Sequence, residues 1–418
     1  MTRHGDSASG PLAALRDPNF ARLMAGVMIS TIGSWMQNAA VPFALYTITK
    51  SATWVGLAAA AQFLPSVPLA PVSAALADRC DRRMVLLVSQ VVQLVCAVGL
   101  WITWVQWPRP GALLALVALG GTANLVVAAT NQAFVSELVP GEGMLGALTV
   151  NSAQANVARA LGPSLGGVLI ASAGVAWVFA VNAVSFLAVI GALWTIRAVR
   201  VPTAFARQGI MRAFGDAVSY SCRHPVIAPT IVLTVVIGAA VYPVNQMAVV
   251  MARQVFDVGP RAFGVLSGAF GAGAVLGAIA LSWLQRRHPT FEAVPITLGC
   301  TALALISYSA SPFFAMAVAS CAVVGAGALI VTALLNTRIQ RQAPSDRRGS
   351  VLAVWVVAYN VAFATGSLLM GRLAEWSTVR TPILIAGLVV AVATTWAATR
   401  RAPASSFDRS LRMEVGAR

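Results

Sequence analysis

The sequence predicts an all-α membrane protein in which twelve transmembrane helices form two pseudo-symmetric six-helix bundles. Of its 418 residues, 58% are apolar and only 10% are charged, whereas about a quarter of a soluble domain is charged. The apolar residues gather in runs of bilayer-spanning length, and the second half of the chain repeats landmarks of the first. Too few polar residues remain to cover such a chain in water, which excludes an ordinary soluble enzyme and a disordered chain.

The apolar runs fall into six, a polar linker and six more. Backbone groups in hydrocarbon must hydrogen bond within their own segment, so each run is expected to be a helix. Residues 1–19 are polar and precede a run of more than twenty residues, which indicates a retained first span rather than a cleaved signal peptide. The runs lie near residues 20–48, 53–77, 84–106, 112–136, 145–171 and 174–196, and then near 226–251, 262–284, 291–309, 312–336, 349–371 and 380–399.

Arginine sets the expected orientation. An even number of spans puts both termini on one side, and 22 of the 29 Lys and Arg residues fall in the tails and loops of that side. Positive loops remain in the cytoplasm, so we expect both termini there, in a multi-pass protein of the inner (plasma) membrane. The expected domains are a cytoplasmic tail (1–19), an N-terminal bundle (20–196), a cytoplasmic linker (197–225), a C-terminal bundle (226–399) and a second cytoplasmic tail (400–418).

A constant offset of 204 residues relates the two halves. One offset that holds across two loops and a span indicates an internal duplication, and many transporters are built from such repeats. The matched pairs are Arg82 with Arg286, Arg83 with Arg287, Pro140 with Pro344, Asn156 with Asn360, Gly162 with Gly366, and Gly167 with Gly371.

Residues 74–83 connect the second and third spans and read Ala-Ala-Leu-Ala-Asp-Arg-Cys-Asp-Arg-Arg. This segment resembles the loop 2–3 signature of the major facilitator superfamily, with Ala74 and Asp81 at two places where that signature has glycine. An acid and several arginines at a cytoplasmic helix end can form ion pairs with the other half of the protein and hold one conformation shut. Alternatively, these charges only set the membrane topology. The candidate cytoplasmic gate comprises Asp78, Arg79, Arg82, Arg83 and Glu137.

The fifth span contains a cluster of small residues, Gly162, Pro163, Gly166 and Gly167. Residues 162–167 resemble the antiporter signature of the same superfamily, which is seen mainly in exporters. Glycines let a neighbouring helix pack closely and proline bends a helix, so these are candidate packing and hinge residues; ordinary small-residue packing is the alternative. Segments 17–20, 61–65, 78–83 and 174–177 resemble the branch that includes enterobactin-exporter-type and drug-efflux proteins, over roughly residues 15–400.

Polar side chains inside the spans are costly in lipid and should face a cavity or a neighbouring helix. Asn and Gln that bond across helices without lining a cavity are the alternative. The resemblance implies the major facilitator fold, in which spans 1, 4, 7 and 10 line a central path and spans 5 and 11 lie beside it. The candidate substrate-cavity residues are Ser34, Gln37, Asn38, Asn124, Asn131, Asn156, Arg159, Tyr242, Asn245, Gln246, Tyr359 and Asn360.

Arg159 is the one basic residue near the middle of a span. It stays charged at physiological pH and needs carbonyls, a carboxylate, water or an anionic ligand. Two roles for Arg159 fit the sequence. It could pair with neighbouring spans and hold the fifth span in place, or it could bind an anion or take part in gating.

The thirteen Asp and Glu residues lie in tails, loops or span ends. We therefore expect a substrate that is neutral or anionic and amphipathic, because exporters of cationic drugs usually need a buried carboxylate. A proton site, if at a span edge, would use Asp78 or Glu137.

Together these features predict a secondary active exporter of a siderophore, drug or metabolite, working by alternating access and driven by protons. The chain has no Gly-x-x-x-x-Gly-Lys-Ser/Thr sequence for ATP, and its His, Cys and acids are scattered, so no enzyme activity, metal or cofactor is expected. An importer on the same fold and a non-transporting receptor or scaffold are the alternatives. The expected partners are a small-molecule substrate, protons and the bilayer, with no nucleic acid, and the expected state is a monomer.

Overall fold

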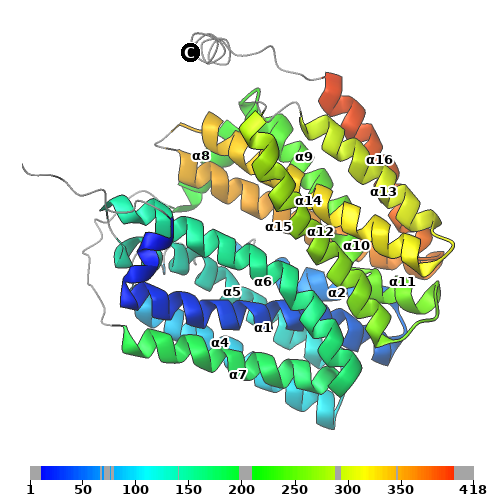
Figure 1. Cartoon of the computed structure of the whole chain (residues 1–418), viewed down its shortest axis with the longest axis horizontal. Helices are drawn as coiled ribbons and strands as arrows, with labels where there is room; N and C mark the ends of the chain where they lie inside the picture. The colour runs from blue at the N-terminus through cyan, green and yellow to red at the C-terminus, as the bar shows by residue number, and fades with distance from the viewer. Residues whose placement is uncertain are drawn as a thin grey trace, which may run out of the picture.

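The computed structural model describes residues 11–65, 68–69, 76, 80–139, 141–196, 210–287, 293–344 and 347–399. In these ranges the regular structure is helical. Figure 1 shows the helices before residue 200 (blue to green) packed together below those after residue 210 (green to red). The predicted fold class, an all-α membrane protein of two helical bundles, is confirmed.

In the N-terminal half, two residues from the family-like segments, Asp17 and Asp81, cap the N-termini of helices. The Asp17 carboxylate accepts hydrogen bonds from the backbone N–H groups of Asn19 and Phe20 at 2.8 and 2.9 Å, and Asp81 accepts one from Met84 at 3.1 Å. Such caps satisfy the free N–H groups of a first helical turn. The helices of this half are α1 (Pro18–Thr49), α2 (Ala52–Phe63), α4 (Arg82–Gln106), α5 (Pro110–Leu138), α6 (Met144–Ala173) and α7 (Val175–Thr195), with short 3-10 turns η1 (Pro11–Arg16) and η2 (Gly141–Gly143).

The C-terminal half differs from the prediction in two places. The expected continuous span at 226–251 is broken into three helices, because Pro243 has no N–H to continue the ladder and the chain turns again at Met247. The expected linker contains an amphipathic helix. The elements are α8 (Ile210–Arg223), α9 (Ile227–Ala240), α10 (Pro243–Gln246), α11 (Ala248–Gln254), α12 (Pro260–Arg287), α13 (Ala293–Ala310), α14 (Phe314–Gln342), α15 (Arg348–Trp376) and α16 (Arg380–Thr399).

Helix bounds repeat with the offset found in the sequence. Shifting α5 (Pro110–Leu138) by 204 residues reproduces the bounds of α14 (Phe314–Gln342), and the first residue of α6, Met144, shifts onto the first residue of α15, Arg348. Packing repeats as well, because Gly162 abuts Trp35 of α1 while Gly366 abuts Ala239 of α9, and both pairs differ by that offset.

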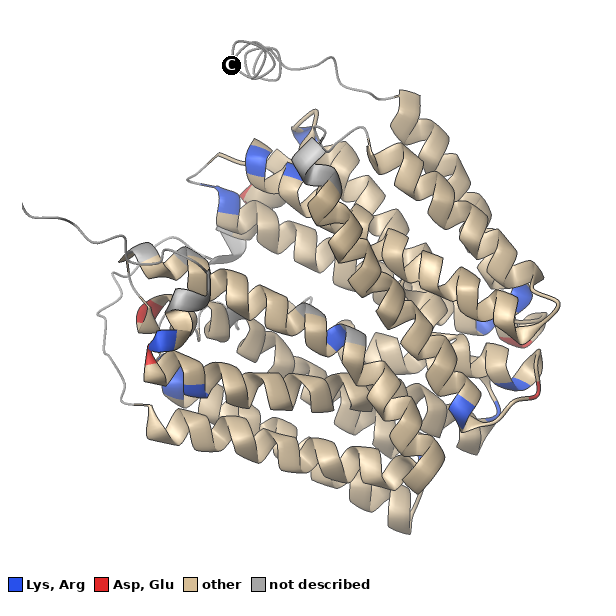
Figure 2. Ribbon diagram, viewed as in Figure 1, with Lys and Arg blue, Asp and Glu red and all other residues tan. Residues whose placement is uncertain are grey.

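Nine helices in the described part of the chain are long and apolar enough to cross a membrane. Helices α1 and α6 are longer still, at 32 and 30 residues, but polar side chains lower their mean hydropathy. Figure 2 shows Lys, Arg, Asp and Glu gathered mainly at the helix ends, which leaves few charged residues in the middle of both bundles. This is the distribution that a bilayer requires.

The two halves meet at one end of the molecule. We call the side on which α1 begins at Pro18 and α16 ends at Thr399 the terminal side, and the side on which α1 ends at Thr49 the far side. Helix α6 packs on α12, and α2 packs on α15. The bundles converge toward the right of Figure 1, the far side, and diverge toward the left.

Candidate functional site

A cavity of about 570 Å³ lies between the two halves. Its lining residues begin near the terminal ends of the helices, at Leu23 of α1 and Leu86 of α4, and stop well before their far ends. The cavity therefore occupies the middle and the terminal-side half of the molecule. Eleven of the twelve predicted substrate-cavity residues line it: Ser34, Gln37, Asn38, Asn124, Asn131, Arg159, Tyr242, Asn245, Gln246, Tyr359 and Asn360.

The twelfth residue, Asn156, belongs to α6, but its side chain lies outside the described part of the structure. So do Asp78 and Arg79 of the predicted gate.

Amide side chains on the N-terminal half both line the cavity and bond across helices. Asn182 of α7 donates to the Gln37 side-chain oxygen at 2.7 Å, and Gln62 of α2 donates to that of Asn38 at 2.9 Å. Asn131 of α5 donates to Asn151 of α6 at 3.2 Å. Cavity lining and interhelical bonding are thus combined in the same residues, and the bonds fix the orientation of amides that a substrate would meet.

Arg159 lies on the cavity wall with its guanidinium over the ring of Trp35, 5.2 Å from the ring centroid. Its Nε is buried without a hydrogen-bond partner. No Asp or Glu is found among the described residues that line the cavity. The wall contributed by α6 therefore carries a positive charge that a nearby carboxylate does not neutralise there.

The wall contributed by α15 is aromatic. The rings of Trp355 and Tyr359 are stacked with centroids 6.4 Å apart, and those of Tyr359 and Phe363 are stacked at 6.3 Å with an interplanar angle of 5°. Tyr242 packs edge-on against Tyr359, and Phe63 of the other half packs edge-on against Phe363. We call Trp355, Tyr359 and Phe363 the aromatic strip; all three line the cavity.

The break between α9 and α11 supplies the polar groups of the C-terminal wall. Tyr242 lies at the first turn of the break, where its hydroxyl is 3.2 Å from the Thr332 hydroxyl. Asn245 and Gln246 follow on α10, and the Asn245 Oδ1 is buried without a partner. Irregular backbone at membrane depth is tolerated where it lines a cavity, so the broken span fits this position.

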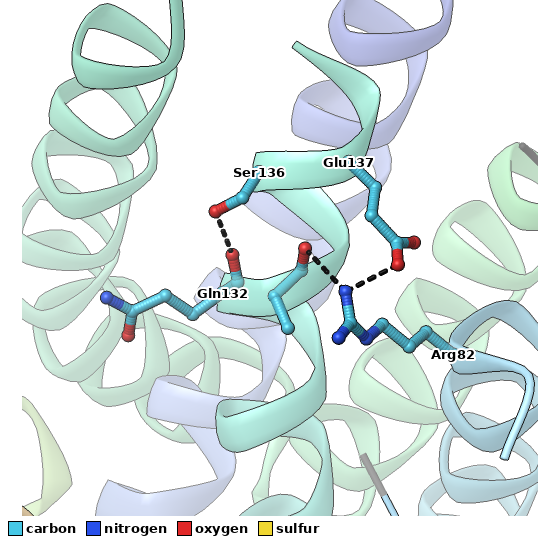
Figure 3. Close-up of polar contacts among 5 residues, drawn as sticks. Arg82, Gln132, Ser136 and Glu137 are labelled. Carbon is cyan, nitrogen blue, oxygen red and sulfur yellow. Dashed lines mark hydrogen bonds and ion pairs between the residues drawn. The ribbon is translucent and has the colours of Figure 1, made fainter. Parts of the chain in front are cut away.

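On the terminal side, the gate arginines that are described bond within the N-terminal half. Arg82 pairs with Glu137 and donates to the Ala133 carbonyl of α5 at 3.4 Å (Figure 3). Arg83 donates to the carbonyls of Leu193 and Trp194 at 2.8 and 3.0 Å. In this conformation these bonds tie α4 to α5 and α7, so a latch to the other half stays a prediction for a different state.

On the far side, the halves are in direct contact. A Cβ on Gly167 of α6 would overlap the backbone of Gly264 of α12, and one on Gly371 of α15 would overlap the Ala52 carbonyl of α2. The Glu375 carboxylate of α15 accepts bonds from the Ser51 hydroxyl at 2.7 Å and the Thr53 N–H at 3.2 Å. These contacts form a far-side seal between the bundles.

The remaining residues of the predicted hinge pack within their own half. Gly162 abuts Trp35 and Gly166 abuts Met36, both on α1, while Pro163 lines the cavity inside an uninterrupted α6. The close approach at Gly162 holds Trp35 beneath the Arg159 guanidinium.

Of the aromatic strip, the sequence prediction included only Tyr359; it missed Trp355 and Phe363, as well as Trp35 and Glu375. The strip has a recognisable sequence pattern, because Trp355, Tyr359 and Phe363 recur every four residues and so share one helix face. The same pattern would also fit a helix face that is directed toward lipid or toward the protein core. Glu375 has no such signal, because Ser51 and Thr53 are more than 300 residues away in the chain.

Comparison with known proteins places this geometry in a family. Residues 9–413 match the sequence profile of the transmembrane secretion effector family. The chain is 26% identical over 375 residues to the enterobactin exporter EntS of Salmonella typhimurium, covering 86% of this chain and 87% of that protein. It is 24% identical over 386 residues to the MFS-type transporter YfiS of Bacillus subtilis, covering 88% and 89%.

Solved structures show the same fold at low identity. The nucleoside transporter NupG superposes with a TM-score of 0.71 at 14% identity over 91% of this chain and 98% of that one. A bacterial homologue of the iron transporter ferroportin, in an inward-facing state, gives a TM-score of 0.67 at 18% identity over 92% and 99%. The duplicated bundles, the cavity between them and the profile match together show that the chain belongs to the transmembrane secretion effector family of major facilitator superfamily transporters.

Proposed function

We propose that this transporter exports a neutral or anionic amphipathic small molecule, such as a siderophore, drug or metabolite, by alternating access. The observation that carries the proposal is the asymmetry between the two ends of the cavity. Its lining extends toward the terminal side, while Gly167, Gly371 and Glu375 join the halves on the far side. Rocking the bundles about the cavity would open the far side and close the terminal side.

Two observations support the proposed outward direction of transport. The arginine distribution favours cytoplasmic termini, and with that orientation this conformation would be inward-facing and able to load from inside the cell. The relatives named enterobactin exporters support outward movement. Fusion of a periplasmic reporter enzyme and a cytoplasmic reporter to the C-terminus tests the orientation, and periplasmic activity there would contradict it.

Protons are the proposed driving ion. The cavity lining described has no carboxylate, so the candidate sites lie at span edges, at Asp78 and Glu137. Glu137 is already in contact with a gate arginine, because it pairs with Arg82 in this state. Protonation of that carboxylate would release Arg82 for the other half, which would couple proton movement to the gate.

Accumulation of a labelled compound panel, in cells with and without the gene, tests the export proposal. We expect lower accumulation of at least one neutral or anionic amphipathic compound when the gene is present, and loss of that difference when the proton gradient is collapsed. Substitution of Asp78→Asn together with Glu137→Gln should remove the gradient dependence. Gradient-driven uptake of the compound into intact cells, instead of efflux, would show an importer.

A further inference from the structure

The two helices that face each other across the cavity are duplicates with different chemistry. With the 204-residue offset, Asn151, Ala155 and Arg159 of α6 correspond to Trp355, Tyr359 and Phe363 of α15. All six line the cavity. The N-terminal strip is therefore polar and cationic, whereas its duplicate is a continuous aromatic surface.

Arg159 creates a requirement for negative charge. Arg159 is partly buried, and each N–H group of its guanidinium that leaves water needs a hydrogen-bond acceptor or a counter-charge. The Trp35 ring offers its face but no acceptor atom, and Nε is buried without a partner. An anionic oxygen in the cavity would supply what this part of the wall does not.

The aromatic strip creates a second, independent requirement. Three stacked rings over two helical turns, with Tyr242 and Phe63 packed edge-on against them, give this wall of the cavity five aromatic side chains. Flat ring systems gain more than their buried area on such a surface, through offset or edge-on packing. Arg159 and Tyr359 line the same cavity of about 570 Å³, so one ligand can contact both walls.

We propose that the cavity binds aromatic anions, with the acidic group of the ligand at Arg159 and its ring system against Trp355, Tyr359 and Phe363. This inference rests on the proposed function and narrows its substrate class from neutral or anionic amphiphiles to aryl acids. A volume of about 570 Å³ suits a ligand of two or more fused or linked rings.

The test is equilibrium binding of radiolabelled 2-naphthoate to the purified full-length protein in detergent. Three unlabelled competitors isolate each requirement: 2-naphthalenemethanol lacks the charge, 2-naphthylmethylammonium reverses it, and decalin-2-carboxylate keeps the charge but lacks the aromatic ring. We expect the alcohol and the amine to compete at least about tenfold more weakly than 2-naphthoate, because they lose the charge-assisted hydrogen bond. The decalin acid should compete at least about threefold more weakly, because it loses the aromatic contacts.

Variants assign the two requirements to the two walls. Arg159→Gln should weaken 2-naphthoate binding about tenfold or more and leave 2-naphthalenemethanol unchanged, while Arg159→Lys should stay within about threefold of the wild type. Tyr359→Leu should weaken 2-naphthoate but not decalin-2-carboxylate. Arg253→Gln is the matched control, because Arg253 also lies over a ring, that of Phe43, but does not line the cavity.

The outcomes separate this inference from the export proposal. Equal binding of the acid, alcohol and amine, or equal loss in Arg159→Gln and Arg253→Gln, would overturn the aryl-acid site even if gene-dependent efflux of other compounds persists. Arg159-dependent binding without 2-naphthoate counterflow in proteoliposomes would keep the site and overturn transport. If Arg159→Gln does not elute as a monodisperse species, Arg159→Lys, Tyr359→Leu and the competitor series still decide the matter.

Discussion

Helices α6 and α15 share their packing positions and differ at their cavity positions. Gly162 and Gly366 each abut a helix of their own half, and Gly167 and Gly371 each abut the opposite half. On the cavity side of the same helices, α6 has the charge of Arg159 where α15 has the ring of Phe363. Duplication has preserved the contacts that assemble the bundles, whereas the cavity surface has diverged into one cationic and one aromatic wall.

The strongest way to break this comparison is to fill the shared packing positions. Gly162→Val and Gly366→Val each push a side chain into the neighbouring helix, and overpacking costs about 1–3 kcal/mol. We expect both variants to lower the melting temperature of the purified protein by similar amounts and to reduce expression in the membrane. Gly191→Val is the control, since no atom lies within 4 Å of a Cβ added there. A large loss in one half alone would mean that the two glycines are not equivalent.

Replacing the cationic residue of the α6 wall with its aromatic counterpart from α15 should reduce transport of aryl acids without unfolding the protein. Arg159→Phe places in α6 the residue that its duplicate has in α15. We expect aryl-acid flux in proteoliposomes to fall at least about tenfold, while the melting temperature stays constant or rises because a buried Nε without a partner is removed. Unchanged flux with a lower melting temperature would give Arg159 a purely structural role.

A smaller effect is expected at the far-side seal. Glu375→Gln replaces charge-assisted bonds to Ser51 and Thr53 with neutral ones; because these bonds are exposed, the cost is at most about 1 kcal/mol. Because the bonds join the two halves, that cost shifts the equilibrium toward the state open on the far side by up to about fivefold. Alkylation of a cysteine introduced at Ser34, by a reagent restricted to the far side, should rise accordingly. Ser377→Ala, which loses a bond to the Leu373 carbonyl in the last turn of α15, should leave alkylation unchanged.

The smallest effect concerns the support of the aromatic strip. The Trp355 indole N–H donates to the Thr234 hydroxyl of α9 at 2.9 Å. Trp355→Phe keeps a ring in the strip but loses this bond, which should cost about 1 kcal/mol and lower the melting temperature by about 1–2 °C. Trp194→Phe, at a side chain 72% exposed, is the matched control and should melt like the wild type.

Sequence reasoning reached the fold and most of the polar cavity because both follow from hydrophobic patterning. Spans of unbroken apolar residues and the 204-residue repeat determine the bundles, and side chains such as Gln37, Asn38 and Asn245 are conspicuous in them. The break at Pro243 escaped prediction because the apolar pattern continues through it. Helix α8 escaped because its segment reads as a charged linker, although Ala217 on its apolar face is buried.

Contacts between distant segments could not be predicted. Nothing in the local sequence says that Glu375 meets Ser51, that Arg159 lies over Trp35, or that Phe63 meets Phe363 across the halves. These depend on how the bundles pack in three dimensions, which hydropathy does not specify. The roles of Asp78, Arg79 and Asn156 stay predictions, because these side chains lie outside the described ranges.

Distances between the ends of α6 and α15 test the rocking of the two halves most directly. Spin labels at Met144 and Arg348 report on the terminal side, and labels at Ser172 and Trp376 report on the far side; all four positions are exposed. With native cysteines replaced, double electron–electron resonance should show that ligand and a proton gradient shorten the terminal-side distance while lengthening the far-side distance. Two distances that stay fixed, that both lengthen or that both shorten would contradict alternating access between these bundles.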